Sequence, residues 1–549
     1  MPLQKNQVLT LRVERLSSDG SGVAHSPDGE TVFIPGAAPG DEARVRIVKD
    51  CKRYAFGILD EVLTPSPDRI PVDCAVAGPC GGCSLRHLDY AAELRAKQEN
   101  VADAFARIGG LDVPVLPIVG SPEVNRYRNK VQFPVGVDKS GKPCIGFYAG
   151  RTHRIVPCPD CRLQPGVLNE IGNALCAFFA EKGIQPYSEE TGRGLVRHIF
   201  LRRGAHSGQI MVCLVCTRAK LPYAEELCTR LKAQFAEITT ILLNVNAKNT
   251  NVILGTETHT LYGQGYIEDT LCGVPVQLGP LSFYQVNTLA AEQLYGIAAQ
   301  YAQLTPDDLL LDLYCGMGTI GFSMAAHCRE LIGVEIVPEA IESAKANAAR
   351  MGADVAAKSR FFCADAGQAA TRLAAEGLHP DIVMLDPPRK GCDEATLSAV
   401  VRMSPRRVVY VSCNPATAAR DAAWLEQNGY HAEKVQPVDL FPRTRHVECV
   451  IALSKGEIDS KKVRVEFSLE GMDTSGLQKG ATYPEIKARV LEQTGLKVSS
   501  LYISQVKQKC GLEVRENHHK ATSENTKQPQ CPKEKEDAIV EALKHFQMI

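Results

Sequence analysis

"LLLDLYCGMGTIGFSMA", residues 309–325, is the stretch that decides the fold. An apolar run is followed by Gly316, Gly318 and Gly321, and a helical pattern begins near Ile320. Glycines allow a tight turn and let a ligand come close to the backbone. A strand, a glycine-bearing loop and a helix in this order are typical of nucleotide-binding α/β folds. The pattern alone is weak, because a dinucleotide enzyme would show a similar loop.

Further apolar strands downstream each end near a residue that can do chemistry. Glu335 ends "LIGVE", where a carboxylate can accept hydrogen bonds from both ribose hydroxyls. Asp365 follows "FFC", a place suited to adenine contacts, and Asp386 ends a fourth strand before two stiffening prolines. Cys413 lies between a strand and an Asn-Pro turn in "SCNPAT". Helices and strands alternate over residues 287–455, which predicts a parallel sheet with crossover helices and these residues at its ligand-binding edge.

The chain has 549 residues, which predicts three or four domains. Its net charge of -1 shows no general preference for a polyanion, so any nucleic-acid surface must be a local patch. The first ~65 residues alternate apolar and polar side chains between Asp-Gly and Pro-Gly turns, the pattern of a small β-barrel. The sequence shows neither an apolar signal core nor a run of membrane-spanning length, so we expect a cytoplasmic protein without a membrane partner.

Twenty cysteines in a long chain without an export signal indicate reduced thiols and a metal site rather than disulfides. "CAVAGPCGGC" holds Cys74, Cys80 and Cys83, with glycines that let the backbone wrap a ligand. "VPCPDCRLQP" offers Cys158 or Cys161 as a fourth ligand. Four thiolates suit a [4Fe-4S] cluster or a structural zinc ion, and the spacing alone does not separate the two.

Two basic stretches of the central region interleave arginines with aromatic residues, "NRYRNKVQF" (125–133) and "RGLVRHIFLRRG" (193–204). Cations can pair with phosphates while aromatic rings stack on unpaired bases. Together the two stretches predict an RNA-contact surface. Solvated charges on strand faces are the alternative for each residue taken singly.

The predicted domains are residues 1–66, a barrel; 67–285, a central α+β domain with the cysteines and the RNA surface; 286–455, the α/β domain; and 456–549, an accessory module. The last module has a strand-like "KKVRVEFSLE", helical patterns in "YPEIKARVLEQTG" and "SSLYISQVKQKCG", and a final short helix. We expect a small α+β appendage that tunes substrate choice or caps the fold.

The set "DLYCGMGTIG", "GVE", "DPPRKG", "SCNPAT" and "HVECV" resembles the S-adenosylmethionine-dependent uracil-5 RNA methyltransferases. The N-terminal barrel resembles the TRAM domain of the branch that acts on ribosomal RNA, and the resemblance covers residues 7–455. It implies a Rossmann-like methyltransferase domain in which the Cys413 thiolate adds to uracil C6 and Glu448 removes the C5 proton. It adds two residues to the cofactor set, which becomes Gln285, Tyr314, Gly316, Gly318, Glu335, Asp365 and Asp386. Asp386 is also placed to orient the uracil edge.

The same resemblance implies a [4Fe-4S] cluster on Cys74, Cys80, Cys83 and Cys161. It implies 5-methyluridine in 23S ribosomal RNA as the product, with the target uridine of an unpaired loop flipped into the pocket and no obligate protein partner. Transfer RNA is the alternative substrate for the same chemistry. A non-catalytic RNA-binding or ribosome-assembly factor is a second alternative, against which the intact Cys413 argues. An amino-group methyltransferase is a third, and it would not need this cysteine.

Overall fold

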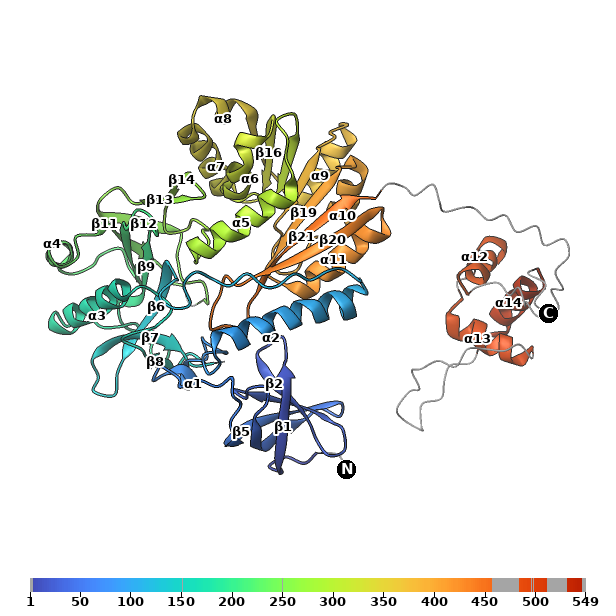
Figure 1. Cartoon of the computed structure of the whole chain (residues 1–549), viewed down its shortest axis with the longest axis horizontal. Helices are drawn as coiled ribbons and strands as arrows, with labels where there is room; N and C mark the ends of the chain where they lie inside the picture. Colours follow the sequence, from blue (N-terminus) through green and yellow to red (C-terminus); the bar gives the residue numbers. More distant parts are fainter. Residues whose placement is uncertain are drawn as a thin grey trace. The chain divides into compact units, whose positions relative to one another are not determined.

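The structure is a computed structural model, and it describes residues 3–150, 152–248, 250–456, 483–494, 496, 498–510 and 531–545. The chain divides into two compact units, Met1–Ser460 and Lys461–Ile549 (Figure 1). The finer boundaries between the barrel, the central domain and the α/β domain stay predictions.

The N-terminal region is a closed five-stranded barrel with the strand order β1-β2-β3-β5-β4, which confirms the predicted barrel. Alternation of side chains builds it, since Ala43, Val45 and Ile47 on β4 point into the core while the residues between them are exposed. The strands are β1 (Val8–Leu16), β2 (Ser21–His25), β3 (Thr31–Pro35), β4 (Glu42–Asp50) and β5 (Tyr54–Thr64).

Helix α2 (Tyr90–Asp103) links the barrel to the α/β region, and Figure 1 shows it between them. It continues as a π-helical turn, η1 (Ala104–Gly109). Lys97 Nζ lies 2.8 Å from a carboxylate oxygen of Glu93 and 2.8 Å from one of Asp439, which lies between the last two strands of the α/β region. All three side chains are at most 1% exposed. A buried ionic network therefore ties the two regions together.

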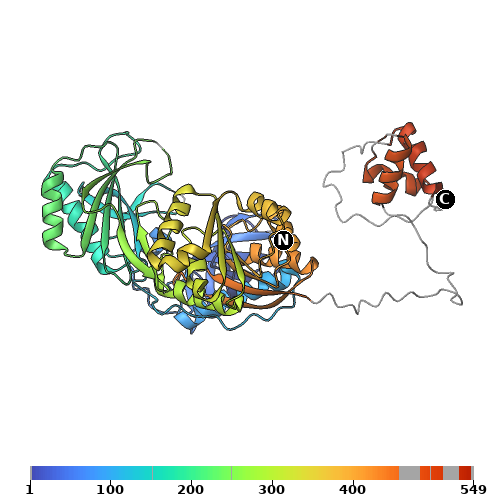
Figure 2. The ribbon, with the colours of Figure 1, turned by 90° about the horizontal axis from the view of Figure 1, so that it is seen from above.

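The central region holds a seven-stranded sheet with the order β12-β11-β10-β9-β6-β7-β8. Figure 2 shows this sheet beside the α/β region. The strands are β6 (Lys130–Val137), β7 (Pro143–Tyr148), β8 (Ile155–Pro157), β9 (Val196–Arg203), β10 (Ile210–Cys216), β11 (Ile238–Val245) and β12 (Glu257–Tyr262). Helices α3 (Gly166–Glu181) and α4 (Ala224–Gln234) pack on it, and a hairpin of β13 (Ile267–Leu271) and β14 (Val274–Leu278) follows.

The α/β region is a second seven-stranded sheet with the order β17-β16-β15-β18-β19-β21-β20. Its strands are β15 (Leu309–Leu313), β16 (Glu330–Glu335), β17 (Ser359–Cys363), β18 (Ile382–Leu385), β19 (Arg407–Ser412), β20 (Tyr430–Val438) and β21 (Glu448–Lys455). One hydrophobic core contains residues of α5 (Thr288–Ala302), α6 (Thr319–Met324) and α7 (Pro338–Met351). A second contains residues of α9 (Ala366–Ala375), α10 (Glu394–Met403) and α11 (Pro415–Gln427). The short η2 (Ala325–His327) and α8 (Ala353–Lys358) complete the region.

The prediction of a parallel sheet holds for β15 to β19 and is wrong for the last strand. Strand β21 runs antiparallel to both of its neighbours, β19 and β20. The connection from β20 to β21, residues 439–447, contains no crossover helix, so the chain returns in the opposite direction. The first residue of β21 therefore lies at the edge where the parallel strands end.

The described part of the second unit contains α12 (Tyr483–Thr494), α13 (Ser500–Lys509) and α14 (Lys533–His545), which agrees with the predicted helices. Ile486, Ile503 and Ile539 are among the apolar side chains that form their common core. The expected strand "KKVRVEFSLE" lies outside the described residues. Within the described ranges, no helix is both long enough and apolar enough to span a membrane.

Candidate active site

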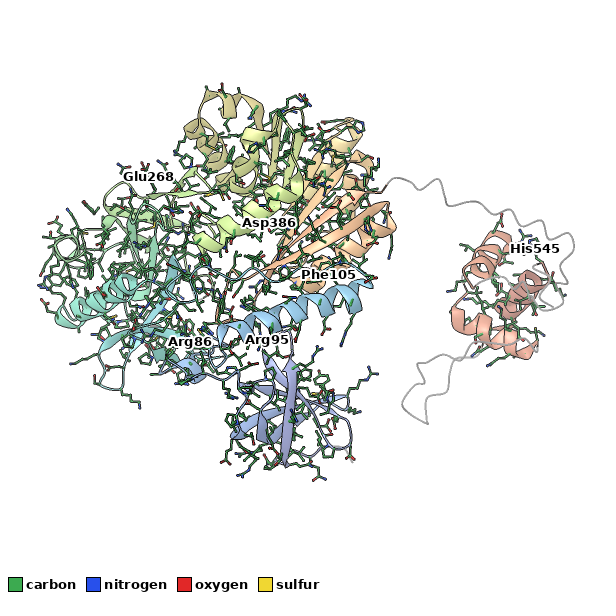
Figure 3. All side chains as sticks on the ribbon, viewed as in Figure 1. Arg86, Arg95, Phe105, Glu268, Asp386 and His545 are labelled. Atoms are coloured by element: carbon green, nitrogen blue, oxygen red, sulfur yellow. The ribbon has the colours of Figure 1, made fainter. Side chains whose placement is uncertain are left out.

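The predicted catalytic residues meet at one edge of the α/β sheet. Asp386 follows β18 and Cys413 follows β19, and these strands are parallel neighbours. Ser412 pairs with Cys449 across β19 and β21, so the antiparallel strand brings Glu448 beside Cys413. Figure 3 labels Asp386 in this region. The three residues come from separate stretches of sequence and lie at the same edge of the sheet, where the parallel strands end.

The "SCNPAT" loop is fixed to the "DPPRKG" loop by hydrogen bonds. Asn414 begins helix α11 as its cap, since its side chain accepts a hydrogen bond from the Ala416 amide. The Asn414 side-chain amide also donates to the Arg389 carbonyl oxygen at 3.0 Å, and the Thr417 hydroxyl lies 3.3 Å from the same oxygen. The backbone of Arg389 is thereby held next to half-buried Cys413.

The charged groups around Cys413 shift the pKa of its thiol in opposite directions. Burial raises the pKa of the Cys413 thiol, and the negative charges of Glu448 and Asp386 raise it further. The Arg389 guanidinium lowers this pKa through its charge and a side-chain hydrogen bond. The resting thiol is therefore protonated, and Arg389 is the neighbour that favours the thiolate, which is the nucleophilic form.

The carboxylates of this edge are tuned toward neutral pH. Burial raises the pKa of Glu448 to about 8, and Asp386 adds to the shift while Arg389 opposes it. Burial likewise raises the pKa of Asp386 to about 7. A group whose pKa lies near the working pH can both take up and release a proton, as general acid–base chemistry requires.

Asp312 is a third such carboxylate, which the sequence analysis did not place in the site. Burial raises its pKa to about 8, and the charge of Asp386 contributes. One carboxylate oxygen accepts the Gly321 amide hydrogen bond at 3.1 Å. The other is buried and has no hydrogen-bond partner among the described residues. The residue was passed over because a buried aspartate at a strand end gives no signal beyond the strand itself.

The glycine loop lies at the same edge. Gly316 has a φ of +56°, and its Cα faces open space, so a ligand can approach the backbone there. Glu335 accepts hydrogen bonds from the Gly316 amide at 3.1 Å and the Val337 amide at 2.9 Å. Both predicted residues therefore contribute to one loop. Tyr314 has a φ of +69°, and its hydroxyl interacts with side chains near α10, including Thr396.

Gln285 reaches the site through Tyr295, a residue that the sequence analysis did not single out. Tyr295 is buried, and its hydroxyl interacts with the side chains of Gln285 and Thr319 and with the charge of Asp386. In the sequence, Tyr295 lies on the apolar face of a helix, and such a position gives no functional signal. Asp365 has a local role in this structure, since its side chain caps α9 by accepting the Gln368 amide at 3.1 Å.

The four predicted metal-binding thiols influence one another. Cys80 ends the short helix α1 (Ala77–Cys80). Burial raises the pKa of Cys80, and Cys161 and Cys74 add to the shift. Burial also raises the pKa of Cys83, again with contributions from Cys161 and Cys80. The two segments of the predicted set are therefore neighbours in space.

A buried cation lies beside these thiols. Arg86 is 2% exposed, pairs with Asp73 at 2.6 Å and interacts with the Cys83 side chain. Its Nε atom is buried and has no partner among the described residues. A guanidinium favours thiolates, the form that binds iron or zinc. In the ranges that the structure describes, no three His, Cys, Asp or Glu side chains are grouped as ligands of one metal ion.

Cys158 belongs to the same neighbourhood. It packs with Cys161 in one small hydrophobic cluster, and its side chain hydrogen-bonds to that of Cys161. This contact raises the pKa of Cys158 and lowers that of Cys161. The choice of Cys161 as the fourth ligand stays a prediction.

The predicted RNA surface is only partly accessible. For most of the second stretch, residues 193–204, the prediction of RNA contacts is wrong. Arg197 and Arg202 on β9 are 5% and 1% exposed, and both donate to backbone carbonyl oxygens instead of facing solvent. In the first stretch, Tyr127 and Phe133 are buried, so neither ring can stack on a base. These basic and aromatic residues build the sheet and its contacts with the α/β region.

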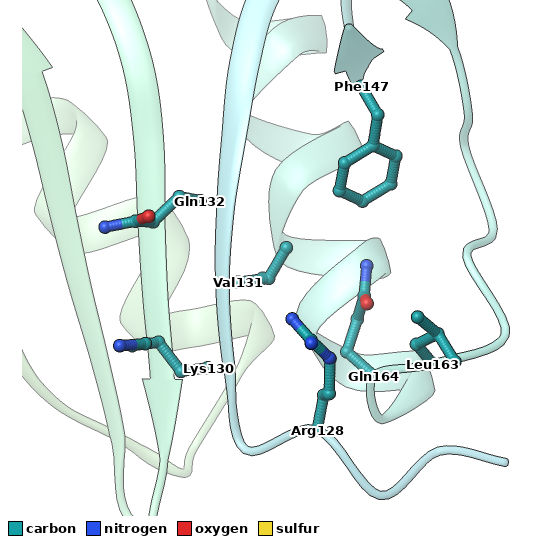
Figure 4. Close-up of a pocket in the computed structure, with 7 residues that line it drawn as sticks. All are labelled: Arg128, Lys130, Val131, Gln132, Phe147, Leu163 and Gln164. Atoms are coloured by element: carbon teal, nitrogen blue, oxygen red, sulfur yellow. The ribbon is translucent and has the colours of Figure 1, made fainter. Parts of the chain in front are cut away.

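A cavity of about 180 Å³ remains accessible in the first stretch. Figure 4 shows Gln164 pointing toward Phe147, with the Arg128 side chain beside it and directed toward Val131. Lys130 also contributes to the lining, and burial lowers its pKa to about 8 with help from nearby arginines. Asn129, between the two cations, donates to the Gln285 carbonyl oxygen at 2.7 Å. The basic cavity therefore neighbours the cofactor-site candidate Gln285.

Comparison with known proteins places the chain in a family. The model described as "tRNA (Uracil-5-)-methyltransferase" matches residues 206–456, and the TRAM domain matches residues 2–59. An uncharacterised RNA methyltransferase of Halalkalibacterium halodurans is 43% identical over 453 residues, which are 82% of this chain and 98% of the relative. One of Oceanobacillus iheyensis is 41% identical over 455 residues, with the same two shares.

Among solved structures, the tRNA (uracil-54, C5)-methyltransferase of Pyrococcus abyssi in complex with S-adenosyl-L-homocysteine is similar to this chain. The TM-score is 0.65 and the identity 27%, and the match covers 81% of this chain and 100% of the other. The fold, the strand-end residues and these relatives agree: the chain belongs to the S-adenosylmethionine-dependent uracil-5 RNA methyltransferase family and carries a TRAM domain.

Proposed function

We propose that the protein methylates C5 of a uridine in 23S ribosomal RNA through a covalent adduct with Cys413. The observation that carries this proposal is the meeting of Cys413, Glu448 and Asp386 at one sheet edge. Uracil C5 is a poor nucleophile, so the reaction needs a thiolate to activate it. A methyltransferase acting on an amino group would not need this cysteine.

The steps follow from the chemistry of uracil. The Cys413 thiolate adds to C6, and the electrons of the C5–C6 double bond move toward O4 to form an enolate. C5 then attacks the methyl group of the cofactor, whose sulfonium becomes a neutral thioether. Removal of the C5 proton expels the thiolate from C6 and restores the double bond. The product is 5-methyluridine, and Cys413 is regenerated.

Glu448 is the base in this proposal. It is 6% exposed and acts on Cys413 electrostatically, so it lies beside the carbon pair that the thiolate engages. Its raised pKa makes the carboxylate a stronger base than an exposed glutamate would be. Asp386, whose pKa is about 7, is placed to hydrogen-bond the uracil edge in its protonated or ionised form.

The bound cofactor supplies the electrophilic methyl group. We assign its binding to the glycine loop at Gly316 and Gly318, to Glu335, and to Gln285 with Tyr295 behind it. Glu335 can exchange its present amide contacts for ribose hydroxyls. Tyr314 and Asp365 stay in the proposed set at the rim of the cofactor site. The unpaired oxygen of Asp312 offers a further polar contact there, and a bound sulfonium cation would favour the ionised form of this carboxyl group.

The RNA is proposed to enter as an unpaired loop with the target uridine flipped out. The base must leave its stack, because a stacked base hides C5 and C6. Arg128 and Lys130 in the basic cavity are suited to phosphates next to the flipped nucleotide. Transfer RNA is the second candidate substrate, and one observation favours it: the matching family model and the Pyrococcus abyssi enzyme are both named for transfer RNA.

We further propose that Cys74, Cys80, Cys83 and Cys161 hold a [4Fe-4S] cluster. The mutual influence of these thiols and the buried guanidinium of Arg86 support this. A bound cluster would cross-link the cysteine-rich segment to the central domain. Anaerobic purification should give about four iron atoms per chain, and Cys161→Ala should lose them. Loss of iron in Cys158→Ala, with iron kept in Cys161→Ala, would make Cys158 the fourth ligand instead.

The test of the proposed function is tritium release from RNA labelled at uracil C5, with S-adenosylmethionine present. We expect release by the wild type and by Cys363→Ala, an exposed thiol at the same sheet edge, and none by Cys413→Ala. Running unmodified 23S ribosomal RNA and transfer RNA in parallel identifies the substrate. Absence of release from both RNAs would favour the non-catalytic RNA-binding factor, and methylation without release would favour another acceptor atom.

A further inference from the structure

Three aromatic rings gather on the outer surface of the N-terminal barrel. Phe33 comes from β3, and Tyr54 and Phe56 come from β5. The ring centroids of Phe33 and Tyr54 are 5.7 Å apart, those of Tyr54 and Phe56 are 5.6 Å apart, and those of Phe33 and Phe56 are 5.9 Å apart. Tyr54 is 40% exposed, and the other two rings are half-buried. We call this group the aromatic triad.

The strand register explains why the triad is on the surface. Phe33 pairs with Phe56 across β3 and β5, and Lys49 pairs with Phe56 across β4 and β5. Paired residues point to the same side of a sheet. The residue between the two β5 rings, Ala55, is fully buried in the barrel core. The triad and the exposed Lys49 therefore share the outward face.

Three cations and one carboxylate lie beside the triad; the carboxylate, Asp50, accepts a hydrogen bond from the Lys52 backbone amide at 2.7 Å. Lys52 and Arg53 directly precede Tyr54 in the turn between β4 and β5, and both are exposed. Within the described part of the chain, no ion pair is found for these two residues or for Lys49. Other cations of the same strands are neutralised, since Arg44 pairs with Glu61 and Arg46 with Asp60. The free cations are thus concentrated beside the rings.

We propose that the aromatic triad is a stacking site for unpaired RNA bases, with Lys49, Lys52 and Arg53 contacting the adjoining phosphates. Exposed aromatic rings flanked by free cations combine the two interactions that hold single-stranded RNA, stacking and phosphate pairing. The rings meet edge to face at Tyr54, with interplanar angles of 79° and 88°, so their faces are not consumed by one another. The bases of a duplex are already stacked and cannot use them.

This site deepens the RNA methyltransferase assignment by placing part of the RNA on the barrel, and it does not depend on the role of Cys413. It would hold nucleotides flanking the flipped uridine or a neighbouring loop of the same RNA. Because stacking tolerates any base, the triad contributes affinity more than sequence selectivity. We therefore expect its loss to raise the KM for RNA and to leave kcat at saturating RNA unchanged.

The test measures binding of the full-length protein to a short fluorescent oligoadenylate, which contains no uridine. Tyr54→Ala and Phe56→Ala should each weaken the affinity by about 5- to 150-fold. Leu63→Ala is the matched control, because Leu63 is on the same strand and is 41% exposed, yet it has no ring. Thermal unfolding of each variant checks that the barrel is intact.

A second variant keeps the proposal falsifiable if the alanine variants misfold. Tyr54→Trp keeps an aromatic ring, so it should bind like the wild type, and single-stranded RNA should quench its tryptophan emission. The chain has a single tryptophan, Trp424, so a Trp424→Phe background isolates the signal. Unchanged emission together with wild-type affinity in Tyr54→Ala would overturn the proposal, as would equal quenching by duplex RNA. The probe lacks uridine, so failure of uracil methylation would leave this result interpretable.

Discussion

At Cys413, a thiol meets two carboxylates that resist its ionisation and one guanidinium that favours it. Such a thiol is unreactive at rest, which protects it from oxidation and alkylation. Substrate binding must then shift the balance, either by protonating a carboxylate or by bringing Arg389 closer. The position of Arg389 is set by the hydrogen bonds that Asn414 and Thr417 donate to its carbonyl oxygen.

Replacing Arg389 by glutamine should therefore make Cys413 harder to ionise. Loss of the cation raises the pKa of the thiol, so alkylation of Cys413 in the RNA-free enzyme should need a higher pH than in the wild type. Peptide mass spectrometry after timed iodoacetamide treatment measures the rate at this cysteine alone. Lys390→Gln is the control, because Lys390 is next in the chain and is not among the residues that shift the pKa of the thiol. Identical pH profiles would show that Arg389 does not activate Cys413.

Glu448→Gln should stop the reaction after methyl transfer. Without a base for the C5 proton, the thiolate cannot leave, and methylated RNA should stay bound to Cys413. Turnover should fall by about 10²- to 10⁴-fold, and a protein–RNA adduct should persist in denaturing gels. Glu433→Gln on the neighbouring strand should turn over normally. If Glu448→Gln turned over like the wild type and left no adduct, Glu448 would not be the base.

Glu448→Gln should also be more stable than the wild type at high pH. Burial raises the pKa of Glu448 from 4.5 to about 8 in the folded protein, so the folded state binds this proton more tightly than the unfolded state does. The free energy of unfolding of the wild type therefore falls, relative to Glu448→Gln, as the pH rises from about 4.5 to about 8. The gap should reach on the order of 2–5 kcal/mol at pH 9. Denaturant unfolding at pH 5, 7 and 9 measures it, and a gap independent of pH would contradict the tuned carboxylate.

At the scale of elements, the loop between β15 and α6 depends on glycine for a steric reason. Gly318 has a φ of +83°, and a Cβ atom there would lie 2.5 Å from the Phe322 ring. The ring belongs to the first turn of α6, so the loop and the helix would have to separate. Local packing therefore requires glycine at this position, which is also part of the proposed cofactor site.

Gly318→Ala should weaken binding of S-adenosylhomocysteine about tenfold or more and lower stability by about 1–3 kcal/mol. Isothermal titration calorimetry and thermal unfolding measure the two effects. Gly296→Ala in α5 is the control, since that glycine is exposed in a helix and nothing lies within 4 Å of an added Cβ. It should be neutral or stabilising. Similar behaviour of both variants would remove the steric argument.

Sequence patterns predicted single helices and strands better than the contacts between distant segments. The barrel and the strand–loop–helix at Gly316 follow from alternation and turn residues, which are local properties. The antiparallel direction of β21 was missed because it depends on a connection that lacks a helix. The burial of Arg202 was missed because its partners, the carbonyl oxygens of Gly279 and Ser282, are distant in sequence.

The candidate site shows the same division. Asp386 and Cys413 could be named from sequence because parallel strands end at a common edge. The place of Glu448 needed the register between Ser412 and Cys449, which no local pattern contains. Tyr295 needed the packing of α5 against the glycine loop. Sequence thus predicts the residues that end strands, and long-range packing decides which others join them.

At the scale of the whole molecule, the buried network of Lys97, Glu93 and Asp439 connects the N-terminal part to the catalytic sheet. Tyr90 joins it by donating its hydroxyl hydrogen bond to Asp439 at 2.9 Å. The Phe441 carbonyl oxygen also accepts a hydrogen bond from Lys97. The network lies on the connection between β20 and β21, which leads to the proposed base, Glu448.

Lys97→Met should destabilise the protein by about 3–5 kcal/mol, because it leaves two buried carboxylates without their cation. Guanidinium unfolding measures the change. The control is Lys345→Met, which removes an exposed 2.8 Å pair with Glu342 and should cost about 0–1 kcal/mol. Equal losses in both variants would mean that the buried network does not hold the regions together.

The most direct test of the central claim is mass spectrometry of the enzyme after reaction with RNA containing 5-fluorouridine. Fluorine at C5 cannot be removed by a base, so the adduct should be trapped after methyl transfer. The account predicts one peptide, containing Cys413, that carries methylated fluorouridine, and no adduct in Cys413→Ala. An adduct on another cysteine, or RNA methylated without any adduct, would contradict covalent catalysis by Cys413.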